Sequence, residues 1–250
     1  ERIGVDASAM EANAAMRSIR RRETGETYRE MLTRMAQASG VATPTAADLK
    51  QMDRRRKGKR TSNGEWASPT DPDAKITRMK DGRTRLAYKP EHAVDLDTDA
   101  LIAAAIHPAD GGDTITLEGT LEAASQALEA AGVAPCAATP AERVADKGYH
   151  SRGVLKDLER GRWQTRIAEP KPKGVLRWQG DSDARRAVSN NRARLRSGVA
   201  KQAFRLRAEK VERSFAHTLD RGGMRRAWLR GNENVHKRYL VHVAGHNLGL

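Results

Sequence analysis

A predicted hairpin, followed by a helix and one further strand in the middle of the chain, restricts the fold more than any other sequence feature. Residues 85–95 and 100–106 have strand patterns on either side of a polar turn at Asp97–Asp99. Apolar residues then recur at helical spacing over residues 116–131, and residues 143–146 predict another strand. A strand that enters a sheet after a helix runs parallel to its neighbour. The pattern therefore predicts the α/β class.

The first residues of the chain predict one more strand of this sheet. Apolar residues within residues 2–12 lead to Asp6, and Glu11 follows. Together with the hairpin, this segment makes three antiparallel strands, and Trp163–Ala168 predicts the last strand. We therefore expect a mixed sheet of three antiparallel strands plus parallel strands, flanked by helices.

Residues 13–83 separate the first strand from the hairpin. Helices are predicted at Thr27–Gln37 and from a Thr45 cap to Lys50. The segment Arg54–Arg60 then contains six Lys or Arg in seven residues, and a polar loop follows up to Asp73. We expect an inserted basic segment, which is either simply solvated or an arm that contacts DNA phosphates.

The C-terminal part predicts two helices after a polar connection around Trp178. One helix is expected from Asn190 until Arg221-Gly-Gly223, and the other at Asn234–Leu248. These patterns divide the chain into segments at residues 1–12, 13–83, 84–168, 169–189 and 190–250.

The excess positive charge lies in the last part of the sequence. Residues 1–150 contain 22 basic and 23 acidic residues, net −1, whereas residues 151–250 contain 24 basic and 9 acidic residues, net +15. Such a surface faces a polyanion, and phosphate contacts from Lys and Arg supply most non-specific affinity for nucleic acid. Nucleic acid is therefore the expected partner.

Several function classes are disfavoured by what the sequence lacks. Cys136 is the only cysteine, which excludes an intrachain disulfide and a zinc site built from cysteines, and fits a reducing cytosol. No apolar run approaches a membrane span, and no Gly-x-x-x-x-Gly-Lys or Gly-x-Ser-x-Gly motif occurs. His242 and His246 have a metal-ligand spacing, but Val243 replaces the glutamate of His-Glu-x-x-His, so core or surface histidines are favoured.

Three acids lie where catalytic carboxylates are expected. Asp6 and Asp146 each follow an apolar strand pattern, and Gly148 predicts a tight turn after Asp146. Open α/β sheets place their chemistry at the carboxyl ends of strands, although one such Asp alone is more typical of a turn or a cap. Glu212 lies in a basic helical pattern.

The segments around these acids resemble the DDE transposases of bacterial insertion sequences, which have an RNase H-like core. The similar segments span nearly the whole chain in the family's order: Val5-Asp-Ala-Ser-Ala-Met-Glu-Ala-Asn13, Tyr88-Lys-Pro-Glu-His-Ala-Val-Asp95, Ala145-Asp-Lys-Gly-Tyr-His-Ser151, Lys210-Val-Glu-Arg-Ser-Phe-Ala-His217 and Gly231-Asn-Glu-Asn-Val-His-Lys-Arg238.

The resemblance implies Mg-dependent phosphoryl transfer on DNA, with Asp6, Asp146 and Glu212 as catalytic and metal-binding residues. Two Mg²⁺ (or Mn²⁺) ions are expected, because hard ions prefer carboxylates and a pair of them can serve both the attacking and the leaving oxygen. In this family water cleaves at a transposon end and the freed 3′-hydroxyl attacks target DNA. Spacing alone does not identify the trio, and each acid taken separately is also read as a surface carboxylate.

Other acids compete with this trio. Glu209 shares a helix face with Glu212 and has a basic residue, Arg205, one turn back, which predicts a solvated ion pair. Asp95 and Asp97 are explained by the hairpin turn, and Glu11 is expected to point elsewhere.

Arginines near the Glu212 helix are the predicted DNA contacts, although the tyrosine and lysine that accompany the glutamate in many relatives have no clear counterpart here. The predicted DNA-binding residues are Arg205, Arg213, Arg221, Arg225, Arg226 and Lys147.

The resemblance predicts a transposase catalytic domain that acts as a homodimer on DNA, without a membrane, in the bacterial cytoplasm at the nucleoid. Because the chain begins at Glu1 and relatives usually carry an N-terminal helical region that recognises the ends, a truncated chain is expected. The alternative function is therefore a catalytically inactive, vestigial or truncated DNA-binding fragment. A nuclease of the same fold is a weaker third possibility.

Overall fold

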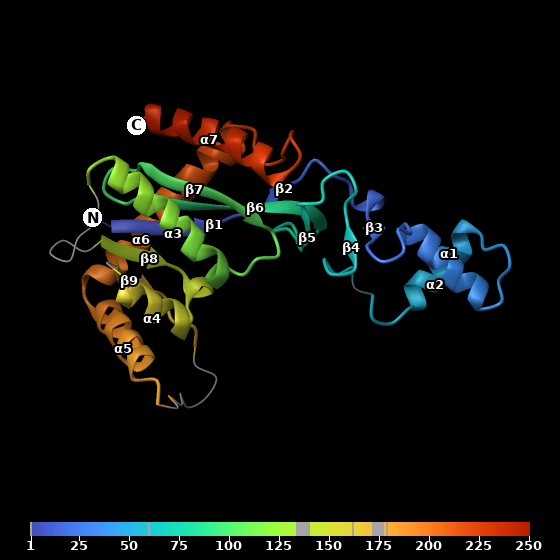
Figure 1. Ribbon diagram of the computed structural model, residues 1–250, viewed down its shortest axis with the longest axis horizontal. Helices are drawn as coiled ribbons and strands as arrows, with labels where there is room; N and C mark the ends of the chain where they lie inside the picture. The colour runs from blue at the N-terminus through green and yellow to red at the C-terminus, as the bar shows by residue number, and fades with distance from the viewer. Residues whose placement is uncertain (1, 60, 134–140, 162, 172–177, 179) are drawn as a thin grey trace.

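The computed structural model describes residues 2–59, 61–133, 141–161, 163–171, 178 and 180–250. The predictions made for Cys136, for Arg60 in the basic run and for most of residues 172–179 lie outside these residues. The described chain forms a mixed sheet with helices on both faces and, at one end, an extension that carries two more helices (Figure 1).

The centre of the sheet has the predicted strand order. Strand β6 (Thr84–Asp95) pairs antiparallel with β7 (Leu101–Pro108) on one side and with β1 (Arg2–Ala7) on the other. Strand β8 (Ala141–Ala145) is parallel to β1, and β9 (Trp163–Ile167) is parallel to β8. The resulting order β7-β6-β1-β8-β9 is compatible with an RNase H-like fold.

Strand β6 extends beyond the end of β1, and two short strands pair with the extra length. These are β2 (Met10–Glu11) and β5 (Lys75–Arg78). The predicted first strand is therefore divided into β1 and β2, and β5 adds part of the 13–83 segment to the main sheet. Neither detail was predicted, because both depend on where β6 finds its partners.

Alternate residues of β1 face two separate helical layers, as the two-residue period of a strand requires. Ile3 and Val5 pack with α3 (Asp113–Ala130), α4 (Arg152–Arg160) and α5 (Ser182–Arg196). The opposite face is covered by α6 (Val199–Phe215) and α7 (Asn232–Leu248). Gly4 on that face has no room for a side chain, since a Cβ would lie 2.8 Å from Leu96 and 3.1 Å from both Arg207 and Val211.

Helices α1 (Tyr28–Ala38) and α2 (Ala46–Arg55) lie beyond the end of the sheet, in the extension visible in Figure 1. Thr27 and Thr45 start them with capping boxes, so the Thr45 cap is confirmed, while α2 continues five residues past the predicted Lys50. The connections contain the short β3 (Arg20–Arg21) and β4 (Trp66–Ala67), which pair with each other, and a 3₁₀ turn at Met16–Ser18.

The C-terminal helices differ from the prediction in two respects. The predicted polar connection at 169–189 already contains the start of α5, which Asp181 caps, and the predicted single helix breaks at Ser197-Gly198 between α5 and α6. Helix α5 buries only small residues and Asn191, so its apolar stripe is weak in the sequence. A π-helical turn (Ala216–Arg221) follows α6, and a 3₁₀ turn (Lys147–Tyr149) follows β8.

Among the described residues, none of the helices has both the length and the apolar character needed to cross a membrane.

Candidate active site

Asp6 and Asp146 lie at the carboxyl ends of two neighbouring parallel strands. The register of β1 and β8 pairs Arg2 with Glu142 and Gly4 with Val144. The same offset aligns Asp6 with Asp146, on strands spaced about 4.8 Å apart. Burial is the main cause that raises the pKa of Asp6; the nearby Asp146 raises it further, while Arg207 lowers it. Two of the three predicted acids therefore meet at one edge of the sheet.

The turn after Asp146 leaves little room for a side chain at Gly148. The Asp146 carboxylate accepts a hydrogen bond from the Gly148 amide at 2.8 Å. A Cβ atom on residue 148 would lie 2.4 Å from Asp113 Oδ2 and 3.0 Å from Asp146 Oδ1. The glycine predicted from the sequence thus lets two carboxylates approach the same backbone. Asp113, the first residue of α3, had not been predicted here.

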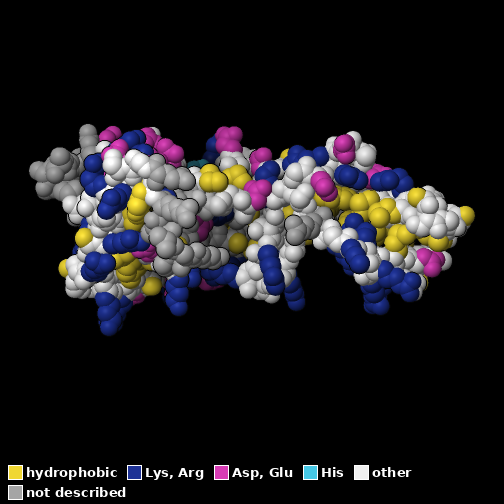
Figure 2. All heavy atoms as spheres, turned by 90° about the horizontal axis from the view of Figure 1, so that it is seen from below, with side chains coloured by type: hydrophobic (Ala, Val, Ile, Leu, Met, Phe, Trp, Pro, Cys, Tyr) yellow, Lys and Arg dark blue, Asp and Glu magenta, His cyan; other side chains and the backbone are white. Residues whose placement is uncertain are grey.

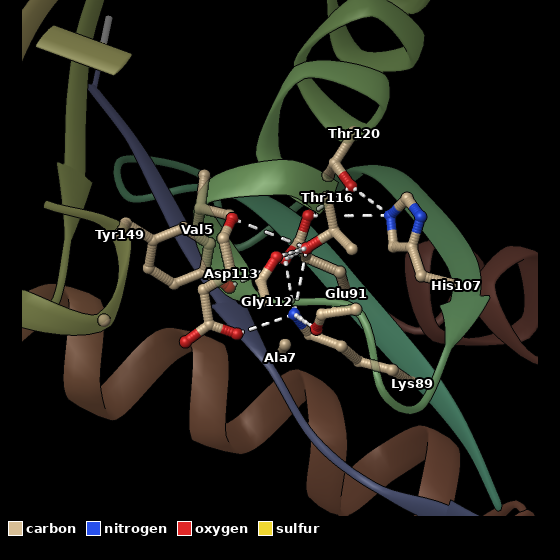
Figure 3. Close-up of polar contacts among 12 residues, drawn as sticks. Val5, Ala7, Lys89, Glu91, His107, Gly112, Asp113, Thr116, Thr120 and Tyr149 are labelled. Atoms are coloured by element: carbon tan, nitrogen blue, oxygen red, sulfur yellow. Dashed lines mark hydrogen bonds and ion pairs between the residues drawn. The ribbon is translucent and has the colours of Figure 1, made fainter. Parts of the chain in front are cut away.

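A buried glutamate, Glu91 on β6, lies beneath this turn and is fully shielded from solvent. Its carboxylate accepts hydrogen bonds from Thr116 Oγ1 at 2.9 Å, Thr120 Oγ1 at 2.6 Å and the Tyr149 hydroxyl at 2.9 Å, as Figure 3 shows. Burial raises the pKa of Glu91, although these hydrogen bonds lower it. Because Tyr149 is three residues after Asp146, this contact attaches the Asp146 turn to β6.

Lys89 supplies the positive charge of the same cluster. Its ammonium lies 2.6 Å from Asp113 Oδ1 and 3.9 Å from Glu91 Oε1, and it donates to Thr116 Oγ1 at 2.9 Å (Figure 3). His107 lies 3.6 Å from Glu91, but burial lowers its pKa to about 4, so the imidazole is neutral near pH 7. Lys89 therefore compensates the two acids.

Arg207 on α6 binds Asp6 directly. Its guanidinium lies 2.9 Å from Asp6 Oδ2 and donates to the Val5 carbonyl at 3.0 and 3.1 Å. Arg207 was not among the residues predicted for this site. The sequence feature that indicates its orientation is its spacing: Arg207 lies four residues from both Ala203 and Val211, which places it on the buried stripe of the helix.

Glu212 is exposed on α6, and among the described residues its side chain makes no ion pair or hydrogen bond. Val211, its neighbour, is buried against the sheet, and consecutive helical side chains point about 100° apart. The described residues contain no group of three or more His, Cys, Asp or Glu side chains that could hold a metal ion. Glu212 is thus not gathered with Asp6 and Asp146.

His92 connects β6 to the turn of α6 that carries Glu212. It faces Asp6 in the register of β6 and β1, and its ring nitrogens lie 2.8 Å from Ser214 Oγ and 2.7 Å from the Tyr239 hydroxyl. The ring also stacks on Phe215 with 3.9 Å between centroids. Complete burial lowers the pKa of His92 to about 3, which keeps the imidazole neutral.

The rival acids have structural partners. Glu209 pairs with Arg213 at 2.9 Å and not with Arg205, so the predicted partner was wrong while the solvated ion pair was right. Asp95 accepts hydrogen bonds within its turn from Thr98 and the amide of Asp97.

Glu11 and His246 also have partners or surroundings that explain them structurally. Glu11 pairs with Arg85. His246 is buried, 5.0 Å from His217 between ring centroids, as expected for a core histidine.

Some of the predicted DNA-binding residues form ion pairs with acidic side chains, and others form none among the described residues. Arg213 is paired with Asp99 at 2.6 Å, and Arg225 with Asp220 at 2.5 Å. Lys147 and Arg205 are exposed and make no ion pair within the described part of the chain.

The two remaining predicted residues have weaker partners. Arg226 is 62% exposed and only 3.9 Å from Glu11. The Arg221 guanidinium lies 3.1 Å from the His217 ring.

The charged side chains are unevenly distributed over the surface. Figure 2 shows many Lys and Arg side chains projecting from one long side of the molecule, over the sheet and over the α1–α2 end. Most Asp and Glu side chains visible in this view lie toward the opposite side. The arrangement suits an elongated polyanion that contacts both parts.

The chain matches a known protein family over its C-terminal part. Residues 173–249, which include α5, α6 and α7, match the family model described as a transposase DDE domain. Neither the curated proteins nor the solved structures contain a match.

Proposed function

We propose that this chain, a DDE-type transposase, cleaves DNA strands at transposon ends and joins the freed 3′ ends to target DNA. Asp6 and Asp146 are the proposed catalytic pair at the carboxyl edge of the sheet, and Glu212 is the proposed third acid. The family match supports the reaction class, and its residues 173–249 include Glu212.

The observation that supports this proposal most is the alignment of Asp6 with Asp146. These two acids are 140 residues apart in sequence, yet they end adjacent parallel strands at the edge where open α/β sheets carry their chemistry. A purely structural role would require neither the two neighbouring like charges nor the raised pKa of Asp6.

The carboxylates of Asp6 and Asp146 are ligands of the type that divalent ions prefer, but too few such ligands lie together among the described residues. Carboxylate oxygens are the ligands that Mg²⁺ and Mn²⁺ prefer. However, the described residues offer no group of three, and Arg207 already binds Asp6. A requirement for Mg²⁺ or Mn²⁺ remains part of the proposed reaction.

The neighbouring residues have roles that the contacts support. Arg207 neutralises Asp6. The hydrogen bond from Tyr149 to Glu91 holds the Asp146 turn against β6, while Lys89 keeps Asp113 beside it. We propose these three as positioning residues for Asp6 and Asp146.

DNA is the proposed substrate, bound along the basic side of the molecule. Arg205, Arg226 and Lys147 are the predicted contacts with weak or absent ion pairs in the described part of the chain, so they are the better candidates for phosphates. A homodimer on DNA, in the bacterial cytoplasm, remains part of the proposal.

A second candidate function is DNA binding without catalysis. It is favoured by the exposed Glu212 and by the ion pair that occupies Asp6. In that case the acids at the sheet edge are structural and no metal-dependent cleavage occurs.

Strand cleavage by variants of the full chain separates the two functions. We expect Asp6→Asn, Asp146→Asn and Glu212→Gln to abolish Mg²⁺- or Mn²⁺-dependent nicking of duplex DNA while binding in EDTA is kept, because binding comes from many phosphate contacts. Glu129→Gln, an exposed glutamate on α3, is the control and should cleave normally. DNA binding by the native chain without metal-dependent cleavage would support the second function.

A further inference from the structure

The segment Arg225–Arg230, between the π-helical turn and α7, exposes an aromatic side chain on a fixed backbone. Trp228 is 69% exposed and Leu229 is 41% exposed. In contrast, Met224 and Ala227 are buried at 0% and 2%. Trp228 and Leu229 are therefore two adjacent exposed apolar side chains on a backbone with buried anchors.

Hydrogen bonds to β2 and to the start of the extension hold this backbone. The Ala227 amide donates to the Glu11 carbonyl at 2.7 Å, and the Glu11 amide donates to the Arg225 carbonyl at 2.9 Å. The Asn13 side chain donates to the Trp228 carbonyl at 2.7 Å, and Arg230 Nε donates to the Asn13 carbonyl at 3.1 Å. The main chain at Trp228 is therefore already held in place, and a ligand that binds the exposed ring does not have to order it.

Three arginines lie within three residues of Trp228 in the sequence. Arg225, Arg226 and Arg230 are all exposed, and Arg226, 62% exposed, has only a distant partner in Glu11 at 3.9 Å. An aromatic platform with adjacent arginines is the combination by which proteins bind single-stranded nucleic acid, since bases stack on the ring and the cations meet the phosphates.

We propose that Arg225–Arg230 is a stacking platform for unpaired DNA bases, with Trp228 as the stacking residue and Arg226 as a phosphate contact. This inference rests on the proposed action on DNA. It adds a preference for single-stranded or unpaired DNA, which duplex binding by the basic side does not require.

The position of the platform relates it to the acidic edge. Glu11 pairs with Ala87 on β6 and Asp6 pairs with His92, five residues further along the same strand. At about 3.3 Å per residue, the platform backbone lies roughly 16 Å from Asp6 along the sheet. On duplex DNA, with 3.4 Å per nucleotide of each strand, this span corresponds to about five nucleotides. Bases bound there would therefore lie close to the strand at the acidic edge.

A second copy of the chain is a less suitable occupant of this surface. A self-associating surface that contained Arg225–Arg230 would bring the arginines of both copies together, and like charges across an interface disfavour association. DNA, in contrast, supplies the opposite charge.

The test measures binding of the full chain to oligo-deoxythymidine and to a blunt duplex by fluorescence anisotropy in EDTA, so that cleavage does not contribute. We expect Trp228→Ala to weaken single-strand binding by about 5- to 150-fold, the range for loss of one stacked base. Trp228→Phe should retain most of this affinity, and duplex binding by both variants should change less than about threefold. Val241→Ala, at a 70% exposed position on α7, is the matched control.

Arg226→Gln provides the second measurement. It should weaken binding to both probes and reduce the slope of log affinity against log salt by roughly one phosphate contact. Single-strand binding by Trp228→Ala equal to that of the Val241→Ala control would overturn the platform while leaving DNA binding intact. A native dimer that Trp228→Ala converts to a monomer in light scattering would also overturn it. Absence of any DNA binding by the native chain would reject the proposed function itself.

Discussion

Replacing Gly148 by alanine tests whether the turn after Asp146 holds a catalytic carboxylate. The added methyl group would start 2.4 Å from Asp113 Oδ2 and 3.0 Å from Asp146 Oδ1, and the backbone of Gly148 is not in the left-handed region. The whole effect therefore comes from the two carboxylates and not from backbone strain.

The two carboxylates can respond differently. Asp113 is 37% exposed and can rotate away, at the cost of its ion pair with Lys89, which we place at about 1 kcal/mol because one partner is accessible to water. Asp146 is held by the amide of residue 148 itself, so it moves with the turn. Since a displacement of about 1 Å at a reacting centre can cost about 100-fold in rate, we expect cleavage to fall by about 10- to 100-fold.

The assay compares metal-dependent nicking with thermal unfolding for Gly148→Ala and Gly153→Ala. Gly153 lies in α4, where a Cβ would meet only Ser151 Oγ at 3.9 Å, so alanine there should leave cleavage unchanged and stabilise the chain by up to about 1 kcal/mol. For Gly148→Ala a fall of Tm by about 2–4 °C is expected. Cleavage by Gly148→Ala at the native rate would refute a catalytic role for the Asp146 turn.

Three further predictions follow from the same contacts. Tyr149→Phe removes the hydroxyl that binds Glu91; we expect cleavage to fall while DNA binding in EDTA is unchanged, and an unaffected nicking rate would contradict the positioning role. His92, with its pKa lowered to about 3 from an ordinary 6.5, stabilises the fold above pH 6.5, and this contribution is lost as the pH falls toward 3, by up to about 1.4 kcal/mol per pH unit. The free energy of unfolding of His92→Gln, measured with denaturant between pH 4 and 6, should therefore depend less on pH than that of the native chain. Equal slopes for the two proteins would contradict this prediction. Glu209→Gln should retain most metal-dependent nicking and Glu212→Gln should lose nearly all of it; the reverse result would move the third acid to Glu209.

The sequence by itself predicted the parts of the fold that short-range patterns encode. The strands β6 and β7, the helix α3 and the strand β8 follow from two-residue and 3.6-residue periodicity, and all are present. The meeting of Asp6 with Asp146 was also predictable, because parallel neighbours bring their carboxyl ends to one edge and both acids follow a strand pattern.

The tertiary structure decided which side chains surround those acids. Tyr149 reaches Glu91 from 58 positions away, and the contact of Ser214 with His92 spans 122 positions. Such contacts depend on strand register and on the rotation of a helix about its axis, and a rotation of one residue turns every side chain by about 100°. That rotation directs Arg207 toward Asp6 and leaves Glu212 exposed. The buried stripe of α6 includes the position of Arg207, but the contact of that stripe with β1 results from packing between segments that are distant in sequence.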